Sequence, residues 1–212
     1  MKYIYDSIKG IERNKNQDSI LVIEDSSFLL LAVFDGVSSN SESYLYINEF
    51  KKQIKNRYKE FLNERSQKLE QLFYNAAIET KLQNINGQST LTALFIPKGG
   101  KASKWISIGD SRLYVFSNSY IETITSDDSI NNILTNYLGK DHITINDFKA
   151  YELDINANYL ICSDGFYSIM HNHLKEFFSA LNFKNMANVK KKLASLQQNK
   201  NIDDSTYIII KA

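Results

Sequence analysis

The sequence predicts a layered α+β fold, and three observations support this prediction. Short apolar segments of strand length occur in runs, amphipathic segments of helix length occur in pairs, and Gly-containing turns separate neighbouring strand segments. Runs of strands and pairs of helices favour antiparallel sheets over the strand–helix alternation of a doubly wound parallel sheet. Only one Pro and eight Gly occur in 212 residues, and no Pro-rich or Gly/Ser-rich linker divides the chain, so we expect one domain over residues 1–212.

The first part of the chain predicts a hairpin followed by two helices. Ser19–Ile23 and Phe28–Phe34 are short apolar runs that a polar turn separates, which is typical of two paired strands. No Pro or Gly occurs from Ser41 to about Asn84, and apolar residues recur there at spacings of three and four. This periodicity predicts two long amphipathic helices with a break near Asn63–Ser66.

The rest of the chain predicts further strands, interrupted by helices. The strands are expected at Ser89–Ile96, Lys104–Ile108, Arg112–Phe116, Ile121–Thr125, Tyr151–Leu153, Tyr159–Cys162 and Thr206–Ile210. Turn signals at Gly99-Gly100 and Gly109-Asp110 separate the first three of these strands. A helix is expected over Ser129–Leu138, because Gly139 is a suitable residue to end it. Two more helices are expected over Leu174–Leu181 and Met186–Leu196.

Charge and composition argue against several classes of protein. The 25 Lys and Arg residues balance the 24 Asp and Glu residues to a net charge of +1, which argues against a general electrostatic attraction to nucleic acid or to an anionic membrane. The single cysteine, Cys162, excludes an internal disulfide and a Cys-rich zinc cluster. No apolar run approaches the roughly 20 residues of a membrane-spanning helix, and the first residues lack the apolar stretch of a secretion signal. We therefore expect a cytoplasmic protein that binds neither nucleic acid nor membrane.

Aspartates recur at the ends of apolar strands, often beside glycine. The positions are Asp35 before Gly36, Asp110 after Gly109, Asp164 before Gly165, and the pair Asp203-Asp204 before the last strand. A single Asp-Gly pair is most often a turn. If the strands are neighbours, however, several carboxylates converge on one point, and like charges at that spacing need protons or cations between them. Oxygen ligands without clustered Cys or His favour the hard cations Mg²⁺ and Mn²⁺.

The order of the short motifs resembles that of the metal-dependent type 2C protein phosphatases, the PPM family, over nearly the whole chain. The segments that carry the resemblance are Arg13-Asn14-Lys15-Asn16-Gln17-Asp18, Ala32-Val33-Phe34-Asp35-Gly36, Ser89-Thr90-Leu91-Thr92-Ala93, Gly109-Asp110-Ser111-Arg112, Leu134-Thr135-Asn136-Tyr137-Leu138-Gly139, Cys162-Ser163-Asp164-Gly165 and Asp203-Asp204-Ser205-Thr206. Each motif alone is weak. Their shared order and comparable spacing make coincidence improbable, and the chain resembles a compact, bacterial-like member.

The resemblance implies a fold and a set of site residues. The fold would be a four-layer αββα sandwich, in which two antiparallel sheets are flanked by helix pairs. Asp35 would bridge two metal ions, the Gly36 carbonyl would bind the second ion, and Asp164 and Asp203 would complete the first. Gln17, Asp18 and Asp204 would lie in the outer shell of the metal site, Asp110 would add a third, weaker metal position, and Arg13 would bind the substrate phosphate. Arg13, Asp18 and Asp35 would be the catalytic residues.

Two departures from the family pattern concern the surroundings of this site. Gln88 stands where the family usually has Gly before its S/T-T pair, which makes the local backbone less permissive. Between Asp127-Asp128-Ser129 and Leu134-Thr135, where family members usually carry a flap of a few dozen residues, only residues 130–133 remain. The resemblance therefore implies a domain from which the flap near 129–133 is largely deleted, and a more open metal site.

The function implied is that of an Mg²⁺- or Mn²⁺-dependent serine/threonine protein phosphatase involved in signal transduction. It would hydrolyse a phosphoester by direct attack of a metal-bridged water, since two cations can share a water and neutralise charge on the attacking and leaving oxygens. Its partner would be a phosphorylated protein substrate, and it would oppose a serine/threonine kinase. Two alternatives stay open: a catalytically weak regulatory or binding module with this fold, and a hydrolase of small phosphoesters.

Overall fold

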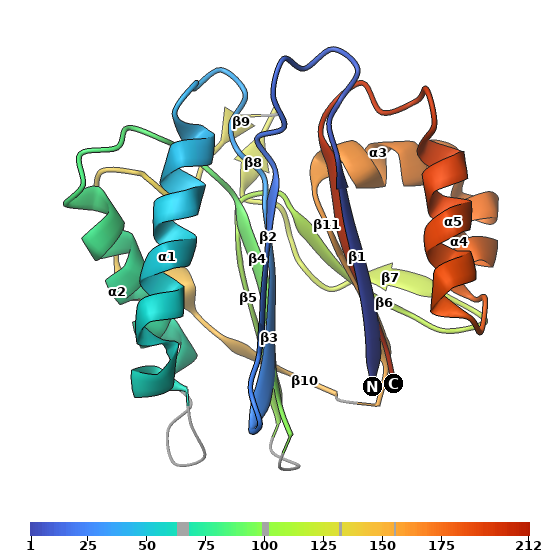
Figure 1. The fold of residues 1–212 in the computed structure, drawn as a ribbon, viewed down its shortest axis with the longest axis horizontal. Coiled ribbons are helices and arrows are strands. Elements are labelled where there is room, and N and C mark those ends of the chain that lie inside the picture. Colours follow the sequence, from blue (N-terminus) through green and yellow to red (C-terminus); the bar gives the residue numbers. More distant parts are fainter. Residues whose placement is uncertain (63–67, 99–101, 132, 155) are drawn as a thin grey trace.

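Two five-stranded antiparallel sheets form the centre of the fold (Figure 1). The structure is a computed structural model, which describes residues 1–62, 68–98, 102–131, 133–154 and 156–212. The first sheet has the order β10-β5-β4-β3-β2 and consists of β2 (Ser19–Glu24), β3 (Phe28–Phe34), β4 (Leu91–Pro97), β5 (Ser103–Ile108) and β10 (Tyr151–Leu153). The second has the order β1-β12-β11-β6-β7 and consists of β1 (Lys2–Ile8), β6 (Arg112–Phe116), β7 (Ile121–Thr123), β11 (Asn158–Cys162) and β12 (Ser205–Lys211).

Helices cover the outer face of each sheet (Figure 1). The first sheet carries α1 (Ser43–Phe61) and α2 (Leu69–Lys81), with the short 3₁₀ helix η1 (Ile145–Phe148) against α2. The second sheet carries α3 (Asp164–Asn172), α4 (Leu174–Leu181) and α5 (Met186–Gln197). The layers are thus helix, sheet, sheet and helix, so the predicted α+β sandwich is confirmed. Within the described part of the chain, no helix combines the length and apolar character needed to cross a membrane.

Strand β3 connects two apolar cores, because all of its side chains are buried and successive side chains point to opposite faces. One set, Phe28, Leu30, Ala32 and Phe34, packs in the core that the first sheet shares with α1 and α2. The other set, Leu29, Leu31 and Val33, packs in the core between the two sheets. A third core lies between the second sheet and helices α3 to α5. The three cores fix the spacing of the four layers.

The predicted helix over Ser129–Leu138 is wrong. Two short strands, β8 (Ser129–Ile130) and β9 (Ile133–Leu134), pair there instead as a small hairpin. Apolar residues at 130, 133, 134 and 138 have helical spacing, but Ile130 and Ile133 are 66% and 71% exposed, so a helix would have had no core against which to bury them. Asn131 has a φ of 51°, in the left-handed region that helices avoid.

Three further elements, β1, α3 and η1, were not predicted from the sequence. Strand β1 pairs with β12, with Ile4 opposite Ile209. Helix α3 begins at Asp164, where the Asp-Gly pair indicated only a turn. The predicted helix break at Asn63–Ser66 and the Gly99-Gly100 turn lie outside the described residues.

Candidate active site

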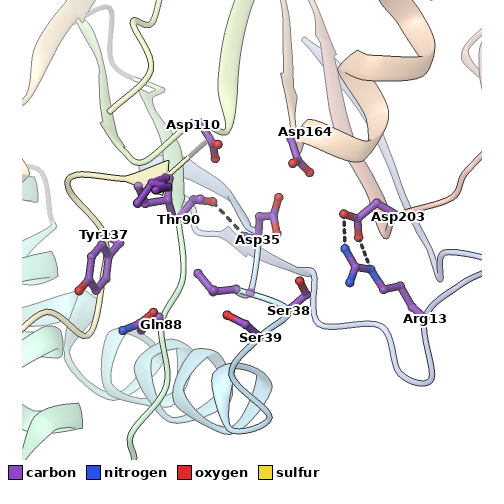
Figure 2. Close-up of a pocket in the computed structure, with 14 residues that line it drawn as sticks. Arg13, Asp35, Ser38, Ser39, Gln88, Thr90, Asp110, Tyr137, Asp164 and Asp203 are labelled. Atoms are coloured by element: carbon purple, nitrogen blue, oxygen red, sulfur yellow. Dashed lines mark hydrogen bonds and ion pairs between the residues drawn. The ribbon is translucent and has the colours of Figure 1, made fainter. Parts of the chain in front are cut away.

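A cavity of about 450 Å³ opens at one end of the sandwich, where loops from both sheets meet (Figure 2). Its charged lining residues are Arg13, Asp35, Asp110, Asp164 and Asp203. The neutral lining residues are Gly36, Val37, Ser38, Ser39, Gln88, Thr90, Ile133, Leu134 and Tyr137. Acidic side chains therefore dominate the charge of this cavity.

Each aspartate of the cavity is placed by the end of a strand. Asp35 directly follows β3, and Asp110 lies between β5 and β6. Asp164 follows β11 as the first residue of α3, and Asp203 lies in the loop before β12. The first sheet thus supplies one side of the acidic cluster and the second sheet supplies the other, which brings together residues far apart in the sequence.

Backbone contacts hold Asp35 at the floor of the cavity. Its amide donates to the Thr90 hydroxyl at 3.1 Å, and the Thr90 amide donates to the Asp35 carbonyl at 2.8 Å. The next residue, Gly36, packs closely on the N-terminal loop, because a Cβ added there would lie 2.7 Å from the Gln17 carbonyl oxygen. Glycine at position 36 therefore lets this loop approach the aspartate.

Mutual repulsion and burial raise the pKa values of the carboxylates. Burial, followed by the charges of Asp18 and Asp164, raises the pKa of Asp35 well above its ordinary value. Burial and the charge of Asp164 raise the pKa of Asp110 to about 6. Burial also raises the pKa of Asp164, with the charge of Asp203 acting in the same direction, although a hydrogen bond with Asp35 offsets part of the shift. A cluster of this kind holds protons or binds cations.

Asp18 lies outside the residues that line the cavity and is buried. The hydroxyl of Ser163 donates to its Oδ2 at 2.8 Å. Burial raises the pKa of Asp18 to about 7, although that hydrogen bond lowers it. Because Ser163 directly precedes Asp164, this hydrogen bond lets Asp18 help to fix the position of Asp164 at the start of α3.

Arg13 contacts Asp203 with both arms of its guanidinium group (Figure 2). Its Nε donates to Oδ1 of Asp203 at 2.6 Å, and its Nη2 donates to Oδ2. The family resemblance implies a phosphate-binding role for Arg13 and a metal-ligand role for Asp203, and here the two side chains bind each other. Two parallel hydrogen bonds from a planar guanidinium are also the geometry in which arginine binds phosphate.

Asp204 and Gln17, which the resemblance places in the outer shell, have structural contacts. The Asp204 carboxylate accepts hydrogen bonds from the backbone amides of Gly10 at 2.8 Å and Gln17 at 2.7 Å. Asp204 thereby fixes the loop that carries Arg13. The Gln17 Nε2 donates to the Ser38 carbonyl at 3.4 Å, and its buried Oε1 has no hydrogen-bond partner in the described part of the chain.

The neutral side of the cavity was not predicted as part of the site. Thr90 and Tyr137 occur within quoted motifs, but nothing in the sequence alone shows that they face the aspartates. Gln88 was noted only for its backbone. No sequence signal reveals them, because isolated antiparallel bridges, Gly36 to Ser89 and Ser89 to Leu138, bring the three short segments to the cavity wall.

The residues present fit a hard cation in their chemistry. As they stand, no group of three or more His, Cys, Asp or Glu side chains among the described residues could hold a metal ion. The cavity nevertheless presents four carboxylates, and its sole cationic lining residue, Arg13, is paired with Asp203. Clustered carboxylates whose pKa values are raised by one another's charge are oxygen donors that suit Mg²⁺ or Mn²⁺. A common metal site for Asp35, Asp164 and Asp203 stays a prediction.

Comparison with solved structures identifies the fold as that of the PPM serine/threonine phosphatases. The PPM Ser-Thr phosphatase MsPP from Mycobacterium smegmatis matches with a TM-score of 0.81 and 20% identity, over 100% of this chain and 98% of that chain. The S. agalactiae serine/threonine phosphatase matches with a TM-score of 0.80 and 15% identity, over 100% and 99%. The catalytic domain of the serine threonine protein phosphatase PstP, in complex with two manganese ions, matches with a TM-score of 0.68 and 20% identity, over 98% and 96%.

These similarities extend over the length of both chains and establish the bacterial PPM-like fold that the motif order implies. No protein-family model and no curated protein matches the sequence. At identities of 20% and 15%, this structural similarity establishes the fold alone.

Proposed function

We propose that this protein is an Mg²⁺- or Mn²⁺-dependent phosphatase that removes phosphate from phosphoserine or phosphothreonine in proteins. The observation that carries the proposal is the convergence of Asp35, Asp110, Asp164 and Asp203 with Arg13 on one cavity. The carboxylates come from strand ends of both sheets, so the fold itself assembles the cluster. Two ions are proposed, with a third, weaker position at Asp110.

The chain's own residues have separate roles in this proposal. The Asp35, Asp164 and Asp203 carboxylates and the Gly36 carbonyl would hold the two cations. When bound, such a pair of cations supplies positive charge and Lewis acidity for the attack of water on a phosphoester. Asp18, which is buried and hydrogen-bonded to Ser163, would lie in the outer shell of the metal site and hold the start of α3 in place.

Arg13 would orient the substrate phosphate. In the structure its guanidinium forms a two-point contact with the Asp203 carboxylate, whose two oxygens present the same acceptor spacing as two phosphate oxygens. We infer that substrate phosphate takes this place while Asp203 turns to the cation. The same contact is the observation that favours a catalytically weak binding module, since both groups are engaged with each other.

The solved structures with the same fold support metal dependence and phosphatase activity in general terms. MsPP is a PPM Ser-Thr phosphatase in complex with cacodylate, and the PstP catalytic domain is in complex with two manganese ions. Divalent metal dependence, action on phosphoproteins and a role in bacterial signalling against a serine/threonine kinase are therefore proposed for this chain, together with a cytoplasmic location.

The test combines metal titration with activity. We expect calorimetry to detect Mn²⁺ binding, and Mn²⁺ to be required for hydrolysis of p-nitrophenyl phosphate and of a phosphothreonine peptide. Asp35→Asn should lower kcat at least about a hundredfold, because removal of a group that positions the charge-stabilising ions costs several kcal/mol. Asp141→Asn, at an exposed loop position outside the cavity, is the matched control.

The outcomes separate the three readings. Absence of cation binding at millimolar Mn²⁺, together with absence of hydrolysis, would contradict the proposal and favour the binding module. Hydrolysis of p-nitrophenyl phosphate and other small esters without hydrolysis of any phosphopeptide would favour the small-molecule hydrolase. Loss of both activities in Asp35→Asn, with Mn²⁺ binding weakened and the fold unchanged by circular dichroism, would support the metal-dependent protein phosphatase.

A further inference from the structure

The cavity has a neutral wall in addition to its acidic one. In Figure 2, Tyr137 and Gln88 lie on the side of the cavity away from Arg13 and Asp203, with Asp35 between the two groups. The Gln88 amide and the Tyr137 hydroxyl make no side-chain hydrogen bond within the described part of the chain, although both side chains are half-buried. Two side chains with hydrogen-bonding groups thus line the cavity without a side-chain hydrogen bond among the described residues.

Backbone pairing explains why these side chains face the cavity. The Ser89 amide donates to the Leu138 carbonyl at 3.2 Å, and the Leu138 amide donates to the Ser89 carbonyl at 2.8 Å. Both of those side chains are fully buried. Because side chains alternate along paired chains, the residues before and after Ser89, and Tyr137 before Leu138, point the opposite way, into the cavity.

Gly139 keeps the two segments in contact. It has a φ of +89°, and a Cβ added there would lie 2.0 Å from the Gly87 carbonyl oxygen. A residue with a side chain at this position would separate the segments and move Gln88 and Tyr137 apart. The neutral wall is therefore a built part of the cavity.

The hairpin of β8 and β9 adds an apolar rim to this wall. Ile133 and Leu134 line the cavity, and Ile130 lies opposite Ile133 in the hairpin. Ile130 and Ile133 are 66% and 71% exposed. Isolated exposed isoleucines need no explanation. A pair that is continuous with the wall of a cavity is different, because a ligand that enters the cavity passes over it.

We propose that the neutral wall and its rim bind the polypeptide next to the phosphorylated residue, and that the preferred segment is uncharged with an apolar side chain. Gln88 would hydrogen-bond a peptide group of the substrate through its amide, and Tyr137 would add a second hydrogen bond. Ile133 and Ile130 would contact the apolar side chain. This inference rests on the function proposed above and names the substrate class of the same site.

The chemistry of the wall selects this occupant. A glutamine side chain offers both an acceptor and two donors, which matches the donor and acceptor of a peptide group. The only cationic residue among the described lining residues, Arg13, lies on the acidic side of the cavity, so the neutral wall gives an acidic substrate side chain no ion pair. A small phosphoester would reach the acidic wall without touching the rim, so the rim adds affinity only when the phosphate belongs to a longer molecule.

The experiment compares two phosphothreonine peptides of equal length with the wild-type protein in Mn²⁺. One peptide carries Val and Leu beside the phosphothreonine, and the other carries Asp at the same positions. We expect kcat/KM to favour the apolar peptide at least about tenfold, the discrimination that burial of one or two apolar groups provides. Ile130→Ser with Ile133→Ser should remove most of this preference by raising KM for the apolar peptide.

A separate variant tests the hydrogen bond. Gln88→Ala should raise KM for both peptides about threefold to tenfold, the usual effect of one lost hydrogen bond, while kcat stays within about twofold. The matched controls are Leu82→Ser, at a leucine that is 66% exposed at the end of α2, and Gln83→Ala beside it. Neither control residue lines the cavity, and both variants should keep the wild-type KM.

The results distinguish this inference from the proposed function. Hydrolysis of both peptides with equal kcat/KM, and with KM unchanged in the hairpin and Gln88 variants, would overturn the inference and leave the phosphatase intact. Hydrolysis of p-nitrophenyl phosphate alone would overturn the inference together with the protein substrate. Absence of every activity would overturn both. If KM for the apolar peptide changed equally in the hairpin variant and in Leu82→Ser, the proposed contact between the rim and the peptide would also be contradicted.

Discussion

Arg13 and Asp203 bind each other through two hydrogen bonds although they are 190 positions apart in the chain. Their contact joins the loop after β1 to the loop before β12, at the edge of the cavity. If Arg13 orients the substrate phosphate, its guanidinium would do so through two parallel hydrogen bonds. A side chain with a single point charge would orient the phosphate less well.

Arg13→Lys should lower kcat/KM for a phosphothreonine peptide at least about tenfold, because lysine offers a point charge in place of the planar fork. Competitive inhibition by inorganic phosphate should weaken in parallel. Steady-state kinetics with a phosphate titration measures both. The control is Arg57→Lys, which changes an arginine paired with Glu79 on the outer helices. Equal activity and equal phosphate inhibition in Arg13→Lys would contradict the assigned role.

The raised pKa of Asp18 predicts a pH-dependent stability. Folding raises this pKa from its ordinary 3.8 to about 7, so the folded protein binds more protons than the unfolded chain between those values. Stability without divalent cations should therefore fall as the pH rises from about 4 to about 7. The raised pKa values of Asp35 and Asp110 act in the same direction. Thermal unfolding in a chelating buffer at several pH values measures the slope.

Two variants and one addition complete this test. Asp18→Asn should flatten the slope, because the amide does not titrate. Millimolar Mg²⁺ or Mn²⁺ should restore stability at the higher pH, because cations offset the repulsion among the carboxylates. Asp141→Asn, at an exposed loop position, is the control. A slope of the opposite sign in the metal-free wild type would contradict the electrostatic description of the site.

Ser163→Ala should destabilise the protein by about 1–3 kcal/mol, the cost of leaving buried polar groups without partners. The Ser163 hydroxyl donates to Asp18 at 2.8 Å and accepts from the Thr206 amide at 3.0 Å, and all three residues are buried. Urea unfolding measures the change. Ser168, an exposed serine in the helix that follows Ser163, provides the control, and Ser168→Ala should change stability by less than about 0.5 kcal/mol. Equal changes in stability for the two substitutions would show that the buried hydrogen bonds of Ser163 do not stabilise the protein.

Gly139→Ala should cost at least about 2 kcal/mol, because it combines a positive φ with a Cβ that meets the Gly87 carbonyl. It should also raise KM for a phosphopeptide, since the segments that carry Gln88 and Tyr137 are held together at this glycine. Urea unfolding and steady-state kinetics measure the two effects. A variant that is stable and has the wild-type KM would show that the contact is dispensable.

Much of the fold could be predicted from the sequence, because strand-length apolar runs and helical periodicity survive in it. The run Phe28–Phe34 became a fully buried strand, and the periodicity before and after the break near Asn63 became α1 and α2. The region 129–138 failed for a physical reason: apolar spacing predicts a helix only if a core receives its apolar face, and the exposed Ile130 and Ile133 have none. Strand β1 was missed because its side chains are only half-buried at the edge of a sheet.

Some residues of the site could likewise be predicted from the sequence, and others could not. Aspartates at strand ends could be marked from the sequence, and the structure places Asp35, Asp110, Asp164 and Asp203 on one cavity. The pairing of Arg13 with Asp203 could not be predicted, because it depends on two loops that meet only in the folded chain. Gln88 and Tyr137 were missed because their direction follows from an isolated bridge between Ser89 and Leu138, which leaves no periodic pattern.

The packing of strand β3 limits which parts of this protein can vary in sequence. Its side chains belong alternately to two cores, so each substitution along it disturbs a different pair of layers. The aspartate that follows the strand is thereby anchored from both faces of its sheet. The exposed Ile130 and Ile133 belong to neither core, so the apolar rim can change in composition while that carboxylate keeps its place.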